Sequence, residues 1–117
     1  MNLNEIIKIA SGNVLTSEAE TEQDIKGGYT ADLMSDVLAS VQPESVLLTG
    51  LCNPQVVRTA QMADIRAIIF ANGKNPTKET IDLANEERVP LISSPYSLFE
   101  LSGRLYQAGL PGMKKSS

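Results

Sequence analysis

Three short runs of apolar residues divide the second half of the chain, at residues 45–49, 67–71 and 90–93. Apolar and polar residues do not alternate within these runs, which is typical of strands that are covered on both faces. After each run, apolar residues recur three or four positions apart, as on one face of a helix. Residues 46–109 are therefore predicted to form three successive strand–loop–helix units.

The first half of the chain is less regular. Apolar residues at helical spacing predict helices at residues 3–10 and 31–41, and residues 13–16 are expected to form a first strand. The stretch 17–24 is polar and acidic and is expected to be a loop. The two glycines at 27–28 indicate a turn.

A polar residue followed by proline stands between each strand of the second half and its helix, at Asn53-Pro54, Asn75-Pro76 and Ser94-Pro95. Asn and Ser can accept hydrogen bonds from the free N–H groups of a helix start, and proline suits the first helical position. Right-handed crossovers place all three helix starts at one edge of a parallel sheet. The predicted fold class is a three-layer α/β/α domain with a small, mainly parallel sheet.

Open parallel sheets bind ligands beyond the carboxyl ends of their strands, where helix N-termini carry positive partial charge. Gly50 and Gly73 allow close approach of the backbone, and Lys74 can meet an anionic group. The residues expected to line this edge and contact a ligand are Thr49, Gly50, Cys52, Asn53, Asn72, Gly73, Lys74, Ser93, Ser94 and Tyr96.

These features also have a purely structural interpretation. The Asn and Ser residues can cap their own helices, and each proline removes an N–H group that an anion would use. Gly73-Lys74 can be a turn with a solvated charge, and Cys52 can be a small buried apolar residue. The pattern alone leaves both interpretations open.

Asp32 and Asp36 form a second group of candidate ligand-binding residues. If residues 31–41 are helical, the two carboxylates are four positions apart and lie on one face, where they can bind a cation or a hydroxyl group. Acidic residues in a first helical turn also favour the helix dipole and face water. Two aspartates alone make a weak metal site, so no metal is expected.

Composition restricts the classes of protein that remain. The net charge is −4, the Lys and Arg residues are not clustered, and no long uninterrupted apolar run or signal-peptide pattern is present, so neither nucleic acid nor a membrane is an expected partner. One cysteine and no histidine favour the reducing cytoplasm and exclude Ser-His-Asp chemistry and histidine metal sites within the chain. No catalytic residues and no cofactor are expected. Residues 1–110 are predicted to be a single domain and 111–117 a flexible tail.

Several separated segments resemble the DRTGG domain family. They are GGYTADLMSDVLA, VLLTGLCNPQVVRTA and AIIFANGKNPTKETIDLANEERVPLISSPYSLFELSGRL, and together they span roughly residues 25–108. At the positions that give the family its name, Thr49-Gly50 is retained, Leu51-Cys52 replaces Asp-Arg, and Ala71-Asn72-Gly73 replaces Thr-Gly-Gly. Only the glycines and the loop shape carry over.

The resemblance implies a regulatory or oligomerising module, similar to the N-terminal domain of HPr kinase and typical of stand-alone bacterial members beside hydrogenase and kinase genes. It implies a homodimer, an adenine nucleotide or another small anion as ligand, and a kinase- or hydrogenase-associated protein as partner. The leading hypothesis is a non-catalytic regulatory domain that binds such an anion. The alternative is an interaction or oligomerisation module without a small ligand, which exposed Met34, Leu38, Phe99 and Tyr106 would favour.

Overall fold

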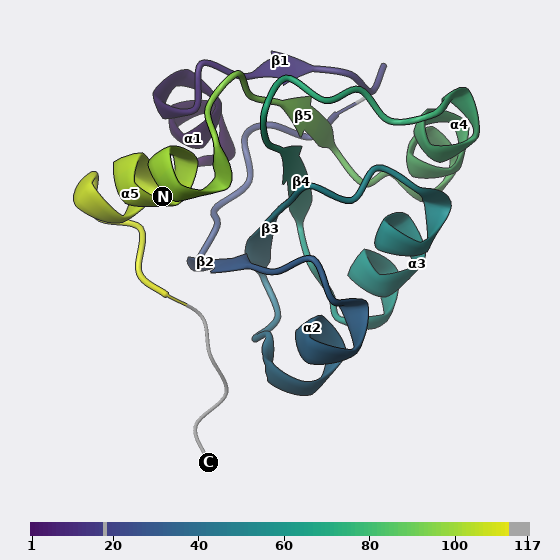
Figure 1. Ribbon diagram of the computed structural model, residues 1–117, viewed down its shortest axis with the longest axis horizontal. Coiled ribbons are helices and arrows are strands. Elements are labelled where there is room, and N and C mark those ends of the chain that lie inside the picture. Colours follow the sequence, from purple (N-terminus) through teal and green to yellow (C-terminus); the bar gives the residue numbers. More distant parts are fainter. Residues whose placement is uncertain (18, 113–117) are drawn as a thin grey trace.

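A five-stranded sheet forms the centre of the molecule, in the computed structural model that describes residues 1–17 and 19–112 (Figure 1). The strand order is β1-β5-β4-β3-β2; β2 to β5 are parallel and β1 pairs antiparallel with β5. The strands are β1 (Asn13–Val14), β2 (Gly27–Thr30), β3 (Ser45–Thr49), β4 (Ala67–Phe70) and β5 (Leu91–Ser93).

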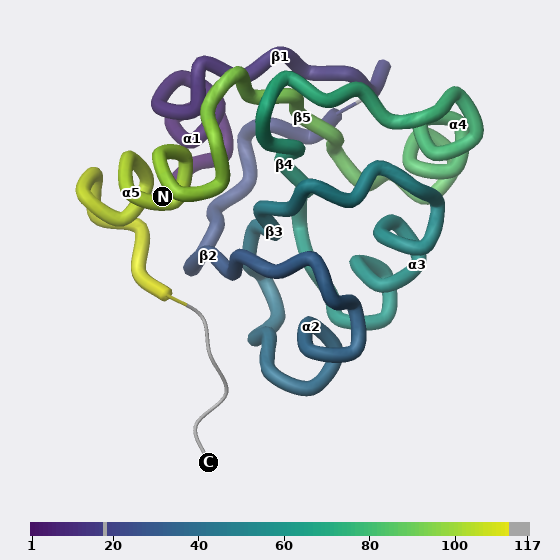
Figure 2. The backbone as a smooth tube through the Cα atoms, viewed as in Figure 1, coloured from purple at the N-terminus to yellow at the C-terminus, as the bar shows by residue number. Residues whose placement is uncertain are grey.

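Helices cover both faces of this sheet, with α1 and α5 on one side and α2, α3 and α4 on the other (Figures 1 and 2). The helices are α1 (Leu3–Ile9), α2 (Met34–Ser40), α3 (Pro54–Met62), α4 (Lys78–Glu87) and α5 (Leu98–Gln107). The predicted three-layer α/β/α fold is therefore confirmed. No helix in the described parts of the chain is long and apolar enough to cross a membrane.

The three central strands are buried on both faces, which explains why their sequences do not alternate. In β3, Val46 and Leu48 pack with α1 and α5, whereas Leu47 packs with the helices on the opposite face. In β4, Ile69 and Phe70 divide between the same two clusters. Burial on both faces removes the polar positions that a half-exposed strand would show.

The predicted turn at residues 27–28 is wrong, because Gly27 and Gly28 begin the edge strand β2 and pair with β3. Gly28 donates its N–H to Pro111 O (2.9 Å), and a Cβ at Gly28 would lie 3.2 Å from Leu110. The glycine suits this close approach of the C-terminal segment, which is not visible in the local sequence. Of the predicted loop and tail, residues 18 and 113–117 lie outside the described residues.

The predicted helix at 31–41 begins three residues late. Ala31 extends the ladder by donating its N–H to Leu48 O, and α2 starts at Met34. Asp32 therefore precedes the helix, and the expectation that Asp32 and Asp36 share one helical face is wrong. Tertiary pairing of residue 31 overrides the local helical pattern.

The cap-proline pattern predicts only one helix start correctly. Pro54 opens α3, but Asn53 makes no side-chain cap. Thr77 and Ser97, which follow the other two prolines, cap α4 and α5 by accepting from Thr80 N and Glu100 N, each at 3.2 Å. Neither Asn75 nor Ser94 caps a helix, because Thr77 and Ser97, one and two residues after the prolines, supply the N-cap hydroxyls and the helices start there.

Candidate functional site

The loops that follow β2, β3 and β4 meet at the carboxyl edge of the sheet. Gly50 lies between Lys74 and Asp32: a Cβ at Gly50 would be 3.5 Å from Lys74 Nζ and 3.6 Å from both carboxylate oxygens of Asp32. Lys74 Nζ donates to Gly50 O at 3.3 Å. The missing side chain at residue 50 thus leaves an exposed ammonium and an exposed carboxylate close together on the surface.

Asp32 fixes the loop after β3. One carboxylate oxygen, Oδ1, accepts from Thr49 Oγ1 (2.9 Å) and from Gly50 N (2.8 Å). Thr49 is fully buried, and its hydroxyl also accepts from Leu51 N at 3.2 Å. Sequence reasoning selected both Asp32 and Thr49 but did not find this contact, because residues 32 and 49 lie on different elements.

The loop after β4 is held by the loop after β5. Asn72 and Gly73 have left-handed backbones, with φ of 60° and 64°. Their N–H groups donate to Tyr96 O (2.8 Å) and Ser94 O (2.7 Å), and Lys74 N donates to Ala71 O (3.2 Å). Because these three amides are already bonded within the protein, the side chain of Lys74 is the positively charged group that this loop presents to an anion.

The polar groups of the β5–α5 loop contact the protein itself. Ser94 is buried, and its hydroxyl donates to Ala10 O at 2.7 Å. Ser93 Oγ donates to Lys74 O (3.4 Å). Tyr96 OH bonds with Ser11 Oγ (2.9 Å), and the Tyr96 ring lies 4.1 Å from the guanidinium carbon of Arg104. The polar groups of these residues are used in contacts within the protein. Ser94 therefore does not share a ligand pocket with Lys74 and Gly50.

Cys52 lies half-buried between β3 and α3. Its thiol donates to Gly50 O at 3.6 Å, and its carbonyl accepts from Thr80 Oγ1 at 3.2 Å. Burial raises the pKa of the Cys52 thiol, against a smaller lowering by Lys74, and Asp32 raises it further. The thiol is therefore protonated at neutral pH and is not an activated nucleophile.

The N-terminus of α3 differs from those of α4 and α5 because no side chain caps it. Asn53 is exposed beside it. A helix start without a side-chain cap retains positive partial charge. Pro54 has no N–H, however, and Val56 N donates to Asn53 O at 3.2 Å. Cys52 and Asn53 place this start in the same loop as Gly50, whose carbonyl Lys74 contacts. Asp36 lies apart, exposed in the first turn of α2.

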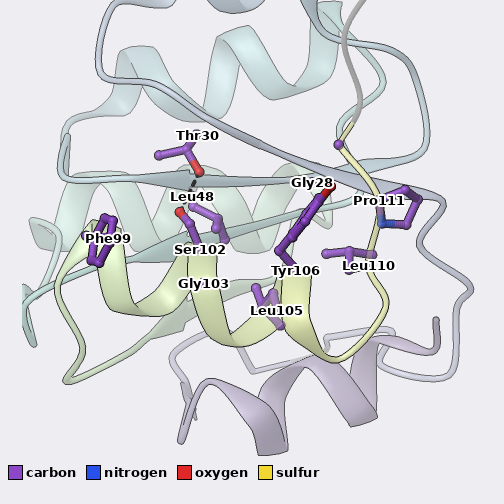
Figure 3. Close-up of a pocket in the computed structure, with 11 residues that line it drawn as sticks. Gly28, Thr30, Leu48, Phe99, Ser102, Gly103, Leu105, Tyr106, Leu110 and Pro111 are labelled. Carbon is purple, nitrogen blue, oxygen red and sulfur yellow. Dashed lines mark hydrogen bonds between the residues drawn. The ribbon is translucent and has the colours of Figure 1, made fainter.

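A pocket of about 340 Å³ lies between α5 and β2, in a place that sequence reasoning missed (Figure 3). Phe99 and Tyr106 lie on the α5 side of the pocket and are 91% and 73% exposed. Their spacing of seven residues on one helix was the available signal. The opposite wall was not predictable, because it includes β2, and Gly27-Gly28 predicted a turn there instead of a strand. Within the described residues, no group of three His, Cys, Asp or Glu side chains is arranged to hold a metal ion.

A mostly parallel sheet between two helical layers defines a three-layer α/β class of domain. The model of the DRTGG domain matches residues 5–108, and the chain belongs to this family. The predicted family membership is confirmed. Among curated proteins, none matches the chain.

A solved structure with the same fold is the crystal structure of the CBS and DRTGG domains of the regulatory region of Clostridium perfringens pyrophosphatase, complexed with its activator, diadenosine tetraphosphate. The two chains are 18% identical, with a TM-score of 0.71. The alignment covers 99% of this chain and 51% of the other, so this chain spans about half the length of that protein. At this identity the likeness concerns the fold alone.

Proposed function

We propose that this chain is a non-catalytic regulatory domain that binds a small anionic ligand of the adenine-nucleotide class and acts as a homodimer in the cytoplasm. Membership of the DRTGG family supports the proposal. So does the pyrophosphatase regulatory region, which contains a DRTGG domain and is complexed with a dinucleotide activator. A regulatory role in turn requires a protein that receives the signal, and a kinase- or hydrogenase-associated protein is the partner proposed.

The observation that carries the proposal is the position of Lys74. Its ammonium is exposed at the carboxyl edge, hydrogen-bonded to Gly50 O, and in the described residues it makes no ion pair. The uncapped start of α3 follows Gly50 by four residues. An exposed cation bonded to the loop that leads into a helix N-terminus favours a phosphate group electrostatically.

The neighbouring residues then have distinct roles. Gly50 leaves the space in which the ligand approaches the backbone, and Asn53 and Cys52 flank the α3 amides. Asp32 uses one oxygen to hold the loop, and its second oxygen is available to accept a hydroxyl of the ligand. The chain contains no histidine and its one thiol is protonated, which supports binding rather than catalysis at this edge.

The first prediction tests Lys74. Adding ADP or inorganic phosphate is expected to raise the melting temperature by mass action. The Lys74→Gln variant is expected to bind either ligand about tenfold more weakly, equivalent to about 1.4 kcal/mol, because one charge-assisted hydrogen bond is lost. Thermal shift and isothermal titration measure both effects.

Lys26→Gln is the matched control, since it removes the same charge at the opposite edge of the sheet, where Lys26 pairs with Glu44. It should bind ADP like the wild type. Equal weakening in the two variants would mean that only net charge matters. The absence of any shift with ADP and phosphate would refute the proposed ligand class.

An interaction module without a small ligand is the second candidate, favoured by the exposed apolar side chains Leu38, Phe99 and Tyr106. Met34, which the same hypothesis expected on the surface, is buried in the core instead. Sedimentation velocity at increasing protein concentration tests self-association directly. A concentration-dependent dimer whose melting temperature no nucleotide changes would favour this candidate.

A further inference from the structure

We propose that the pocket between α5 and β2 binds the flat, uncharged ring of a nucleoside. The inference rests on the proposed function for the choice of a nucleoside, but it concerns a different surface. Its support comes from the shape of the pocket, its lack of charge, its hydroxyl pair and its position beside the carboxyl edge.

The missing side chain of Gly103 opens part of the space, whereas Leu110 packs against Gly28. Gly103 lies in the middle of α5 and Gly28 in β2, on opposite walls of the pocket (Figure 3). A Cβ at Gly103 would meet no atom within 4 Å. The resulting volume of about 340 Å³ lies at the lower end of the range of small-molecule sites, about 300–1,000 Å³.

The rings of Phe99 and Tyr106 line this space. Phe99 and Tyr106 are separated by two helical turns, about 10 Å along the axis of α5. Figure 3 shows Phe99 at one end of the pocket and Tyr106 farther along, with Ser102 and Gly103 between them and Leu110 and Pro111 beyond Tyr106. Their exposure leaves both rings room to move against a bound molecule. Aromatic surfaces favour flat rings, which stack on their faces or meet their edges.

The described residues that line the pocket carry no charge. None of its eleven residues is Asp, Glu, Lys or Arg. A charged group placed here would lose its hydration without gaining a partner, which costs free energy. Charge complementarity therefore selects an uncharged part of a ligand, and a nucleobase is such a part.

One pair of hydroxyl groups gives the pocket its polar contact. Thr30 Oγ1 and Ser102 Oγ lie 2.9 Å apart, and either can donate to the other (Figure 3). When one O–H serves this bond, the pair still offers one donor and free acceptor lone pairs. A ring edge with an adjacent donor and acceptor, as on a nucleobase, matches this pair.

The pocket is also adjacent to the edge that carries Lys74. Thr30 precedes Asp32 by two residues, and Leu48 of the pocket precedes Gly50 by two. Two residues of extended chain span about 7 Å. A base held at Thr30 and Ser102 thus leaves a ribose near Asp32 and phosphates directed toward Lys74.

The test uses the full chain with adenosine, which has the ring without phosphate, and with ADP. Adenosine is expected to bind the wild type, with NMR shift changes at Gly28, Gly103 and Tyr106. The Gly103→Leu variant fills the pocket and should weaken both adenosine and ADP at least tenfold. Gln107→Leu adds the same side chain to α5 outside the pocket and should bind both ligands normally.

The outcomes separate this site from the edge. If Lys74→Gln weakens ADP but not adenosine, both proposals are supported. If ADP binds and depends on Lys74 but not on Gly103, the pocket proposal is overturned and the edge stands. If Gly103→Leu weakens adenosine binding but Lys74→Gln leaves the affinity for ADP unchanged, the pocket proposal is supported and the proposed anion site is refuted.

Two further results would overturn the pocket proposal. One is binding of indole, which lacks the paired edge, as tightly as adenosine, because the hydroxyl pair would then select nothing. The other is a wild-type dimer that Gly103→Leu converts to a monomer while adenosine fails to bind either form. In that case the face is an interface between two copies of the chain.

Discussion

Asp32 acts at the scale of a single residue, by joining two loops that are distant in the sequence. Its Oδ1 accepts from the hydroxyl of Thr49 and the amide of Gly50. Both donors lie at the end of β3, where the ladder stops and backbone groups need new partners. The carboxylate thereby fixes the backbone that surrounds Gly50, and with it the carbonyl that receives Lys74.

The second prediction concerns this contact. Asp32→Ala is expected to lower the free energy of unfolding by about 1 kcal/mol, since two hydrogen bonds at an exposed carboxylate are lost. Asp32→Asn should recover much of the loss, because its amide oxygen remains an acceptor. Urea denaturation measures both values. Asp36→Ala is the comparison, expected to cost only about 0.3 kcal/mol through the helix dipole; equal losses for the two aspartates would contradict the assigned role.

At the scale of the elements, the helix starts are set by residues after the prolines. Thr77 caps α4 through its hydroxyl, which accepts from Thr80 N and also bonds with Thr80 Oγ1 at 2.8 Å. Ser97 has the equivalent place in α5. In α3, by contrast, proline occupies the first helical position and no side chain caps the start. Pro54 has no N–H and Val56 N already donates to Asn53 O (3.2 Å), so the start of α3 keeps its positive partial charge but few N–H groups.

The third prediction compares the observed cap with the one that the sequence indicated. Thr77→Ala should destabilise the domain by about 1 kcal/mol, the usual cost of removing an N-cap hydroxyl. Asn75→Ala should change the stability little, because Asn75 is exposed and caps nothing. Denaturation in urea gives both differences, and a larger effect at residue 75 than at 77 would show that the helix begins earlier.

At the scale of the whole molecule, the two edges of the sheet have different chemistry. The carboxyl edge combines loops, glycines and Lys74, whereas ion pairs hold the amino edge together. Glu44 pairs there with Lys26 (2.9 Å) and Arg66 (3.1 Å). These residues immediately precede β3, β2 and β4, so the cluster joins the beginnings of three neighbouring strands. This edge is held by ion pairs, whereas the site proposed for the ligand lies at the other edge.

The fourth prediction is a dependence of stability on pH. The hydrogen bond and attraction of Lys26 hold the pKa of Glu44 below its ordinary value of 4.5, against the opposing effect of burial, and Arg66 lowers it further. A lowered folded-state pKa gives stability that is present above the unfolded value and is lost as pH falls through the folded value. Glu44→Gln should therefore be less stable than the wild type at pH 7, with a smaller difference at pH 3. Chemical denaturation at both values measures this, and a difference independent of pH would contradict it.

The second half of the chain was predictable because its determinants are local. Unalternating apolar runs indicate buried strands, and the helical spacing after each run indicates the crossover, so 45–49, 67–71 and 90–93 gave β3, β4 and β5 at nearly the correct bounds. The candidate edge followed from the handedness of the crossovers. Gly50 and Lys74 were found in this way, and their contact agrees with the expected geometry.

The sequence by itself therefore determined the layered fold, the family and the edge at which three loops meet, since repeated apolar patterns encode burial within one segment. Tertiary structure alone decided the strand at Gly27–Thr30, the role of Asp32 and the pocket beside α5. Each of these depends on partners far along the chain: Gly28 bonds to Pro111, Asp32 to Gly50, and Thr30 to Ser102. In the local sequence a glycine pair predicts a turn, because glycine has no side chain that indicates what its backbone will contact. The strand at Gly27 and Gly28 forms because distant segments pair with it.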